Sequence, residues 1–542
     1  MRRILPGCAL ASALLLMTTS TAFAASSVVR ASDPNLLAAC TAGQGPPTAG
    51  AEFNYRDAEV EPFVAVNPLD PSNVIGVWQQ DRWSDGGAHG LVAGFSKNGG
   101  HTFAESLLPF DSCSAPGNPT VSEFTRASDP WVSIGSDGTA YAISLSVSFQ
   151  NNDNAVLAAT STDKGATWGN VNVVKFDAGT SAIIPTLTRF FNDKESITAD
   201  PTRNGVAYAV WDRIESPSAS FEANFHAHAF HGPSWFSRTT DGGKTWEPAR
   251  MIFDPGTQNQ TIGNIIVVAP NGVLFDFFDL LQTHKNAGGL RGASVAMISS
   301  SDQGVHWSAP VIVARDDGIG VVDPNNVNPR TNAPPAPLRV GANVPEPAVD
   351  PQTGQLYVTW EDSRFSGGAF DEVAISTSAD GGATWTAPKR VNTPTGHPGF
   401  TPSVAVTNSG ARGVPGTVGV SYYQLEATSP GSMPTDYFLK RFSSAAVSSS
   451  KADSIDSGVT AEDVTAASPT KGPFNMLAAP FARGYFTGDY ESLTSIGGSF
   501  LPFYVQTNCQ DLSCRALTSV VPPGNRTPTD NNSTDVYAGL GF

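Results

Sequence analysis

The chain has 542 residues, of which 32 are basic and 49 acidic, and its formal net charge at neutral pH is −17. Because binding to a phosphate backbone requires a basic surface, this balance excludes nucleic acid as an expected partner. Beyond residue 24, no stretch approaches the ~20 continuous apolar residues that cross a bilayer, so no membrane span is expected.

The first 24 residues have the pattern of a secretory signal peptide. Two arginines precede an apolar run that ends at Met17, and small residues close the stretch at Ala24. A lipoprotein signal is the alternative, because residues 5–8 read Leu-Pro-Gly-Cys, but the apolar run follows that cysteine instead of preceding it. We therefore expect residues 1–24 to be removed and the protein to be secreted or periplasmic. The mature chain then keeps 30 basic and 49 acidic residues, a net charge of −19.

Four cysteines remain after the signal peptide, namely Cys40, Cys113, Cys509 and Cys514. An even number of cysteines outside the cytoplasm favours disulfides, and the sequence leaves three pairings open. Nearness favours Cys509 with Cys514, which leaves Cys40 to join the N-terminal segment to Cys113. The alternative is that some of these thiols stay reduced.

Five octets with the pattern Ser/Thr-x-Asp-x-Gly-x-Thr-Trp recur along the chain. They lie at residues 96–103 (SKNGGHTF), 161–168 (STDKGATW), 239–246 (TTDGGKTW), 300–307 (SSDQGVHW) and 378–385 (SADGGATW). Asp or Asn caps a turn through its side chain, Gly supplies a positive φ, and the aromatic ring buries the end of a hairpin. The octets therefore predict repeated β-hairpins.

A second repeat, an apolar strand followed by a turn and a strand that ends in an aromatic residue, recurs seven times, the last copy being the weakest. The copies lie at residues 62–78, 130–143, 197–211, 265–277, 348–360, 403–423 and 492–505. Short strands at regular spacing, without a sustained helical period, indicate an all-β repeat protein in which each unit is one four-stranded blade.

The octets resemble the Asp-boxes, or BNR repeats, of the sialidase-like β-propeller family, and the resemblance covers most of the chain after the signal peptide. It implies an all-β β-propeller with Asp-box hairpins on the outer side of its blades. The seven strand repeats predict seven four-stranded blades, and six, the number in sialidases, remains the alternative if the last segment only completes another sheet.

We expect one folded unit with no separate second domain. The predicted divisions are a signal peptide at 1–24, an N-terminal segment at 25–58, the propeller at 59–522 and a C-terminal tail at 523–542. Three stretches that interrupt the repeats are interpreted as loops between strands, and they run over residues 214–235, 323–344 and 443–468.

Residues that enter the innermost strand of each blade should face the axis of a propeller, so that equivalent positions form a ring. The repeats place these residues in the ring: Glu59, Glu61, Arg126, Asp129, Lys194, Glu195, Gln260, Thr261, Glu346, Thr401, Asp489, Tyr490 and Glu491. Converging carboxylates repel each other, which raises some pKa values and permits acid and base roles in glycoside chemistry. The alternative for any one carboxylate is that it caps backbone amides or pairs with a neighbouring base. The catalytic candidates are Glu61, Asp129, Glu195, Glu346, Tyr423 and Tyr490.

The ends of the second strands carry charged groups beside aromatic residues, as in residues 79–83, where Arg82 and Trp83 follow Asp81. A guanidinium beside an aromatic ring suits a sugar-like ligand, although an Asp–Arg pair can also simply bridge two blades. The substrate-binding candidates are Arg82, Trp83, Arg126, Arg213, Arg364 and Asp489.

The resemblance to sialidases breaks at one position. In that family three arginines clamp the substrate carboxylate, a tyrosine assisted by a glutamate is the nucleophile, an aspartate is the acid/base, and the first arginine precedes a proline at the start of the first blade. Here Pro62 stands as expected, but Val60 occupies the position of that arginine. The clamp would have to come from Arg82, Arg126, Arg213, Arg291 or Arg364, and the nucleophile from Tyr422, Tyr423 or Tyr490.

A separate cluster holds Glu222, His226, His228 and His231. The spacing is compatible with a metal site, but we interpret the cluster as part of a surface loop and expect no metal and no cofactor.

The resulting hypothesis is a monomeric, secreted, sialidase-like glycoside hydrolase that acts on extracellular glycans at the axial pocket. Two alternatives remain open: a non-catalytic propeller that binds a glycan or a protein, and a polysaccharide lyase on the same scaffold, in which a Tyr or His abstracts a proton next to a uronate.

Overall fold

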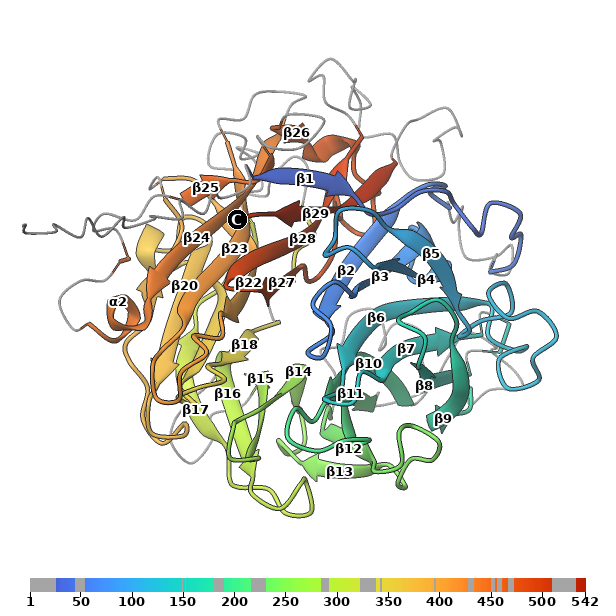
Figure 1. The fold of residues 1–542 in the computed structure, drawn as a ribbon, viewed down its shortest axis with the longest axis horizontal. Helices are drawn as coiled ribbons and strands as arrows, with labels where there is room; N and C mark the ends of the chain where they lie inside the picture. The colour runs from blue at the N-terminus through green and yellow to red at the C-terminus, as the bar shows by residue number, and fades with distance from the viewer. Residues whose placement is uncertain are drawn as a thin grey trace, which may run out of the picture.

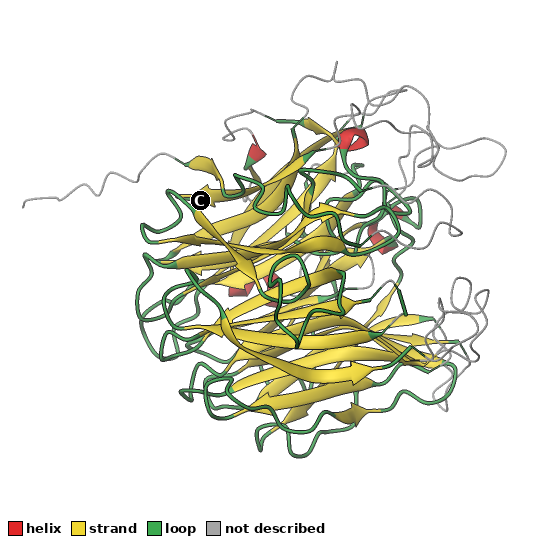
Figure 2. Ribbon diagram, turned by 90° about the vertical axis from the view of Figure 1, so that its right-hand side faces the viewer, coloured by secondary structure: helices red, strands yellow, loops and turns green. Residues whose placement is uncertain are grey.

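The strands of the protein form a ring of antiparallel sheets (Figures 1 and 2). The computed structural model describes residues 26–43, 54–148, 150–151, 153–179, 190–215, 231–283, 292–321, 338–341, 344–393, 396–426, 433–449, 454–455, 461–465, 472–508 and 533–542. None of the helices in these ranges has the length and apolar character needed to cross a membrane. The architecture is the β-propeller that the repeats predicted.

The described strands group into seven four-stranded units in chain order. Unit 1 has β2 (Glu59–Val66), β3 (Val74–Arg82), β4 (Ala88–Ser96) and β5 (Ala104–Leu108). Unit 2 has β6 (Arg126–Ile134), β7 (Ala140–Val147), β8 (Asn154–Ser161) and β9 (Gly169–Asp177). One pair of residues, Ala88 and Ala127, links these two units into a single sheet. Unit 3 has β10 (Phe190–Ala199), β11 (Ala207–Glu215), β12 (Ser234–Thr239) and β13 (Arg250–Phe253).

The remaining units follow the same order from the inner to the outer strand. Unit 4 has β14 (Asn259–Val268), β15 (Leu274–Gln282), β16 (Ala293–Ser300) and β17 (Val311–Asp316). Unit 5 has β18 (Glu346–Val349), β19 (Leu356–Asp362), β20 (Glu372–Ser378) and β21 (Lys389–Arg390), with the short helix η1 (Arg364–Ser366) after β19. Unit 6 has β22 (Gly399–Val406), β23 (Thr417–Leu425), β24 (Pro434–Ser443) and β25 (Ala461–Asp463). It also carries β26 (Phe474–Asn475), α2 (Ser444–Ser448) and η3 (Met476–Ala478).

The last unit joins the two ends of the chain. It consists of β27 (Ser492–Ile496), β28 (Ser499–Thr507), β29 (Thr534–Leu540) and β1 (Ser27–Arg30), and β1 pairs antiparallel with β29. The expected divisions at 58 and 523 left these two strands outside the propeller, whereas the sheet includes them. The physical reason is closure, because an outer strand from the N-terminus completes a sheet built from the C-terminus.

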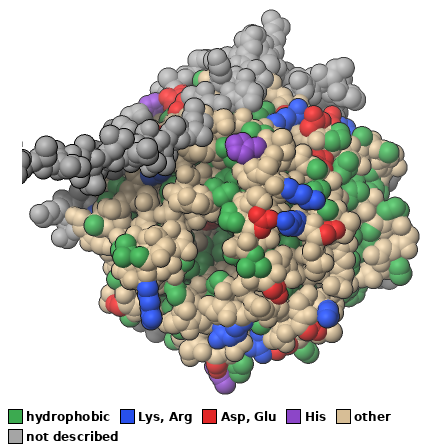
Figure 3. All heavy atoms as spheres, viewed as in Figure 1, with side chains coloured by type: hydrophobic (Ala, Val, Ile, Leu, Met, Phe, Trp, Pro, Cys, Tyr) green, Lys and Arg blue, Asp and Glu red, His purple; other side chains and the backbone are tan. Residues whose placement is uncertain are grey.

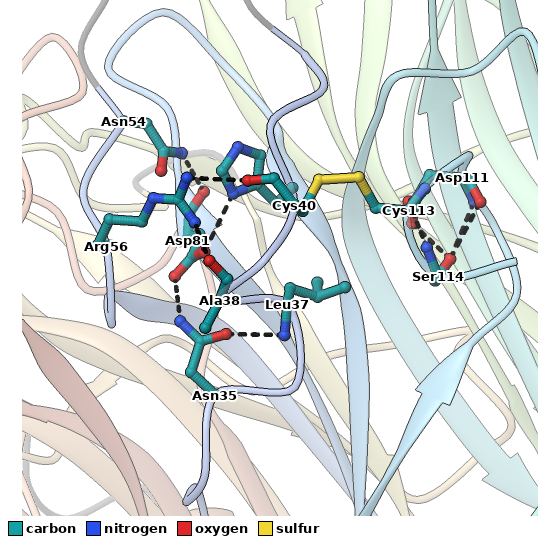
Figure 4. The surroundings of a disulfide bond; sticks show 11 residues. Asn35, Leu37, Ala38, Cys40, Asn54, Arg56, Asp81, Asp111, Cys113 and Ser114 are labelled. Carbon is teal, nitrogen blue, oxygen red and sulfur yellow. Dashed lines mark hydrogen bonds and ion pairs between the residues drawn. A yellow bond between two sulfur atoms is a disulfide. The ribbon is translucent and has the colours of Figure 1, made fainter. Parts of the chain in front are cut away.

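A disulfide fixes the N-terminal segment that follows β1 (Figure 4). Cys40 is bonded to Cys113, as predicted, with their Cα atoms 5.8 Å apart. Nearby, the buried Asp81 accepts hydrogen bonds from the Asn35 side chain at 2.8 Å and from Arg56 at 3.3 Å. The N-terminal segment is thus held to unit 1 by covalent and polar contacts. The second predicted pair, Cys509 with Cys514, lies outside the described residues, as does the predicted signal peptide.

The innermost strands are β2, β6, β10, β14, β18, β22 and β27, and they surround the axis (Figure 1). Each contacts the next in chain order, and β27 contacts β2 to complete the ring. Between the units lies an apolar core that includes Trp78, Trp211 and Trp360, which stand at equivalent positions of the second strands and are fully buried. These are the aromatic residues that ended the sequence repeat.

The five octets form turns between the third and fourth strands of units 1 to 5, and their hydrogen bonds are nearly identical. In the third octet the Asp241 carboxylate accepts hydrogen bonds from the Thr245 amide at 3.0 Å and hydroxyl at 2.6 Å, and the Thr239 hydroxyl accepts from the Gly243 amide at 3.0 Å. Side chains therefore form hydrogen bonds with the backbone amides of the turn, which have no partner in a neighbouring strand.

Candidate active site at the axial end of the inner strands

The innermost strands share a backbone irregularity near their N-terminal ends. In five units the pairing register with the second strand shifts over two residues, which is the mark of a β-bulge. The first bulge residue has a positive φ in each, namely Glu61 (54°), Asp129 (51°), Lys194 (50°), Gly263 (71°) and Thr401 (45°). Left-handed backbone is costly for residues other than glycine, so the fold imposes the conformation at this position and leaves the side chain free to vary.

Three of these bulges meet at the Lys194 ammonium group. Its Nζ lies 3.0 Å from an Asp129 carboxylate oxygen, 3.4 Å from Glu61 and 2.7 Å from Asp489, which belongs to the loop before β27. All four side chains are largely or fully buried. We call Glu61, Asp129, Lys194 and Asp489 the axial cluster. The predicted convergence of Glu61, Asp129 and Asp489 is therefore present, with a lysine at its centre.

Two arginines border the axial cluster on the Asp489 side. Arg339 donates from Nε to the Asp489 carboxylate at 3.0 Å, and its second contact, from Nη2, makes the pair bidentate. Both Arg339 and Arg82 lie over the ring of Phe486, at 4.4 and 4.9 Å from its centroid. Arg82 donates to Gln79 at 2.6 Å, and Gln79 in turn donates to Glu61. A chain of polar contacts thus links Arg82 to the axial cluster.

The carboxyl groups of the axial cluster have pKa values that are shifted in different directions. Burial and the nearby Asp129 raise the pKa of Glu61 to about 8, although Lys194 opposes the shift. Burial acts on the Asp129 carboxyl too, but Lys194 and the Ser128 hydroxyl outweigh it and lower its pKa. The pKa of Asp489 is lowered far below its usual value because Arg339 and Lys194 overcome its burial. At neutral pH one carboxyl is therefore largely protonated beside two that are ionised.

Two further predicted residues adjoin the cluster. Glu195 follows Lys194 in the bulge, is buried, and neither of its carboxyl oxygens has a hydrogen-bond partner among the described residues. Burial and the nearby Asp129 raise the Glu195 pKa well above its ordinary value. Tyr490 donates its hydroxyl to the Pro130 carbonyl at 2.9 Å, and its ring contacts Trp131 edge-on at 5.1 Å between centroids. Its pKa is raised by burial and the surrounding carboxylates, so the phenol stays neutral.

The other predicted acid and nucleophile lie away from this cluster. Tyr423 is fully buried among aromatic rings of unit 6 and donates to Glu491 at 2.7 Å, while Tyr422, on the opposite face of the strand, is buried in another part of the core. Burial and Glu491 raise the Tyr423 pKa well above its usual value. Glu346 lies further along the axis, where the Ser403 hydroxyl donates to it at 2.8 Å, and it lines a central cavity.

Four predicted binding residues contact other parts of the protein instead of the axial cluster, namely Trp83, Arg126, Arg213 and Arg364. Arg126 is buried, stacks over Trp83 at 4.3 Å from Cζ to the ring centroid, and donates to the Gly43 carbonyl at 2.6 Å. Arg213 forms a bidentate pair with Asp177, at 2.8 and 2.5 Å.

Arg364 pairs with Asp362, its Nε lying 2.8 Å from the carboxylate. Arg291 and the cluster of Glu222, His226 and His228 lie outside the described residues, whereas the His231 Nε2 donates a hydrogen bond to the Asp254 carboxylate at 2.8 Å. The described residues thus do not assemble a clamp of three arginines from the five considered.

Sequence reasoning missed Arg339 altogether. It lies in the Pro- and Asn-rich stretch interpreted as a loop, and no repeat assigns it a position. Lys194 was placed in the ring but not among the catalytic or binding candidates, although a lysine among the axial acids was a usable signal. Over the described part of the chain, no group of three or more His, Cys, Asp or Glu residues is arranged to hold a metal ion.

Beyond the bulges the axis contains a cavity of about 280 Å³. Its walls come from all seven innermost strands, and apolar residues such as Phe63 and Trp131 stand there beside polar ones such as Glu346 and Ser403. Figure 3 shows the centre of the ring hollowed, with hydrophobic side chains around the hollow. The axial cluster and this cavity are therefore successive features of one axis.

No protein-family model matches the sequence. Among solved structures, an α-L-arabinofuranosidase from Fusarium graminearum matches 73% of this chain and 99% of its own, at 13% identity and a TM-score of 0.43. The sialidase Hz136, described as Hadza microbial, matches 68% of this chain and 64% of its own, at 15% identity and a TM-score of 0.40. A protein of unknown function from Dyadobacter fermentans matches 90% of this chain and 97% of its own, at 14% identity and a TM-score of 0.42.

Proposed function

We propose that the protein is an exported glycoside hydrolase whose reaction takes place at the axial cluster. The observation that carries this proposal is the pair Glu61 and Asp129, two carboxyl groups that contact the same ammonium nitrogen yet have pKa values shifted in opposite directions. Such a pair supplies an acid and an ionised carboxylate at one pH, which is the requirement of glycosidic bond cleavage.

The geometry supports distinct roles for the two groups. Glu61, with a pKa of about 8, holds a proton at neutral pH and can donate it to the oxygen of the leaving sugar. Asp129 is ionised and can stabilise the positive charge that develops on the sugar ring, attack the anomeric carbon, or activate a water. Lys194 keeps Asp129 ionised, so we assign it as a positioning residue.

Two finer hypotheses from the sequence receive unequal support. An exo-sialidase needs a guanidinium clamp, and in the described part of the chain only Arg82 and Arg339 border the cluster, with Arg339 already paired to Asp489. A lyase needs a base with a low pKa, whereas Tyr490 donates its proton to a carbonyl and its pKa is raised. We therefore propose hydrolysis without a sialic acid requirement.

A glycan-binding propeller without turnover is the second candidate. It is favoured by the ion pairs, because Lys194 and Arg339 engage Asp129 and Asp489 within the protein itself. A substrate would have to displace or share these contacts, whereas a ligand that only binds could rest against them.

The test uses a panel of chromogenic glycosides and polysaccharides, with sugar release as the readout. On any substrate that the wild-type protein cleaves, we expect Glu61→Gln and Asp129→Asn each to reduce kcat by about 10²–10⁴-fold, the usual contribution of a positioned acid or base. The matched control is Glu105→Gln, because Glu105 is a partly buried carboxyl outside the axial cluster that accepts a hydrogen bond from the Asp33 amide and whose pKa burial raises to about 7. Full activity in both axial variants contradicts the proposal, and binding without release across the panel supports the second candidate.

A further inference from the structure

A second pocket lies on unit 5, between the short helix η1 and the segment that contains β21. It has a volume of about 590 Å³ and is lined by Arg364, Phe365, Ala387, Pro388, Arg390 and Ser454. Both ionisable residues of this described lining are arginines, although the chain as a whole has a net charge of −17. A pocket whose charged side chains are all of one sign attracts ligands of the opposite sign, so this one favours an anion.

The carboxylates that pair with these arginines do not line the pocket. Arg364 contacts Asp362 through Nε at 2.8 Å and through Nη2 at 2.6 Å, and Asp362 is fully buried. Glu372, also buried, lies 3.7 Å from Nε of Arg390. Among the described residues, the lining therefore presents guanidinium groups without a carboxylate beside them on its surface.

Arg364 is held in a fixed orientation and keeps one nitrogen available. Its Nε and Nη2 contact Asp362, and Nη2 also donates to the Arg315 carbonyl, whereas Nη1 donates to none of the described residues. The Trp360 indole donates to the same Asp362 carboxylate at 2.8 Å and so fixes the partner as well. With 26% of its side chain exposed, Arg364 can offer Nη1 to a ligand oxygen without breaking its ion pair.

Apolar side chains share the lining with the two arginines. Phe365 and Pro388 are partly buried, and Ala387 is exposed. Phe365 packs against the core between units 4 and 5, which keeps its ring in place. The pocket thus combines hydrogen-bond donors with an apolar wall, and its volume falls within the ~300–1,000 Å³ of ordinary ligand pockets.

We propose that this pocket binds a small organic anion, a carboxylate on a compact apolar body, and that Arg364 binds the carboxylate through Nη1. Arg390 contributes the second positive charge, and Phe365 and Pro388 contact the apolar body. The pocket shares no lining residue with the axial cluster, so the site does not depend on a hydrolytic function.

The probes are phenylacetate and phenylacetamide, which have nearly the same shape and differ in charge. Each is titrated into the full-length mature protein at pH 7 and constant ionic strength, with ligand-observed NMR as the readout. We expect phenylacetate to bind about tenfold more tightly than phenylacetamide, the usual weight of a hydrogen bond to a charged group. Inorganic sulfate, which carries charge without an apolar body, should compete with phenylacetate only weakly.

Three variants test the assignment. Arg364→Lys keeps a charge beside Asp362 but removes Nη1, and it should weaken phenylacetate about tenfold while leaving phenylacetamide unchanged. Ala387→Trp fills the pocket from an exposed position and should weaken both probes. Ala383→Trp, the matched control, places the same side chain at an exposed position of the fifth octet, outside the lining, and should change neither.

Several results overturn the proposal. They are equal affinity for the two probes, no binding of phenylacetate at its solubility limit, unchanged phenylacetate affinity in Arg364→Lys, and equal effects of Ala387→Trp and Ala383→Trp. Sulfate that binds as tightly as phenylacetate also overturns it, because the site would then take inorganic anions only. Should Arg364→Lys fail to fold, the probe comparison and the two tryptophan variants still decide the outcome.

Discussion

The outer hairpins and the inner bulges of this propeller are both repeated five times. The hairpins repeat a set of residue types, whereas the bulges repeat a backbone conformation. The octets repeat residue types, because the third residue, an Asp or in the first octet an Asn, accepts a hydrogen bond from the amide four residues later in every turn. The bulges repeat only a backbone conformation, and their first residues are Glu, Asp, Lys, Gly and Thr. A motif that must close a turn constrains its side chains, whereas a bulge that only needs a positive φ leaves them available for chemistry.

The largest expected difference between the two regions concerns their lysines. Lys194→Met removes the ammonium from three buried carboxyl groups, and we expect a loss of about 3–5 kcal/mol in unfolding free energy at pH 7, the usual cost of an orphaned buried charge. Lys164 lies in the second octet and forms an exposed ion pair with Asp70, so Lys164→Met should leave the stability nearly unchanged. Denaturant unfolding of both variants measures the contrast, and equal losses would show that the axial cluster has no special electrostatic role.

The glycines of the third octet separate packing from backbone strain. Gly242 and Gly243 have φ values of 78° and 77°, but a Cβ on Gly243 would lie 2.4 Å from Thr160 of unit 2, whereas one on Gly242 meets nothing within 4 Å. Gly242→Ala should cost about 1 kcal/mol for the left-handed backbone alone. Gly243→Ala should cost about 2–4 kcal/mol because overpacking adds to it. Thermal unfolding with matched buffers compares them, and a smaller loss for Gly243→Ala would contradict the unit-to-unit contact.

The two regions should respond to pH in opposite directions. The raised pKa of Glu61 means that its contribution to stability is complete below about 4.5 and is lost as the pH rises toward 8. Hydrogen bonds from Thr245 lower the pKa of Asp241 to about 2, so its contribution is present above its ordinary value of 3.8 and is lost as the pH falls toward 2. Melting temperatures are measured from pH 3 to pH 9. We expect the melting temperature of Glu61→Gln to depend less on pH than that of the wild type in the upper part of this range, and that of Asp241→Asn to depend less on pH in the lower part. The reverse assignment would contradict both shifts.

The smallest expected effect tests whether the bulge is only a backbone device. Thr401 holds a φ of 45°, which is unfavourable for a β-branched residue, and its hydroxyl is buried without a partner among the described residues. Thr401→Gly should therefore change the unfolding free energy by less than about 1 kcal/mol and can raise it. Gly263→Val at the equivalent position of unit 4 should lower it. Loss of stability in Thr401→Gly comparable to that of Lys194→Met would show that the side chain matters.

The repeats made the fold and part of the site predictable. The octets gave the positions of five outer turns, and equivalent strand positions brought Glu61, Asp129 and Lys194 together before any coordinates. Such reasoning works because one backbone pattern recurs in each unit. It could not find Arg339, which reaches Asp489 from a non-repeating segment, or one of the partners of Arg126, a backbone carbonyl in the irregular N-terminal segment.

Tyr422 and Tyr423 also show what the sequence pattern could not predict. Alternation along β23 predicts that Tyr422 and Tyr423 face opposite ways, which they do, but both faces are buried. Periodicity distinguishes the two faces of a strand, whereas the depth of each face depends on how neighbouring units pack.

The pairing of β1 with β29 also bears on how the chain folds. Val28 lies opposite Gly539, so the last sheet joins residues from the two extremes of the polypeptide. Contacts of such high sequence separation raise the contact order and are slow to form. During synthesis the first units can assemble as they emerge, but the ring stays open until β29 is made and pairs with β1.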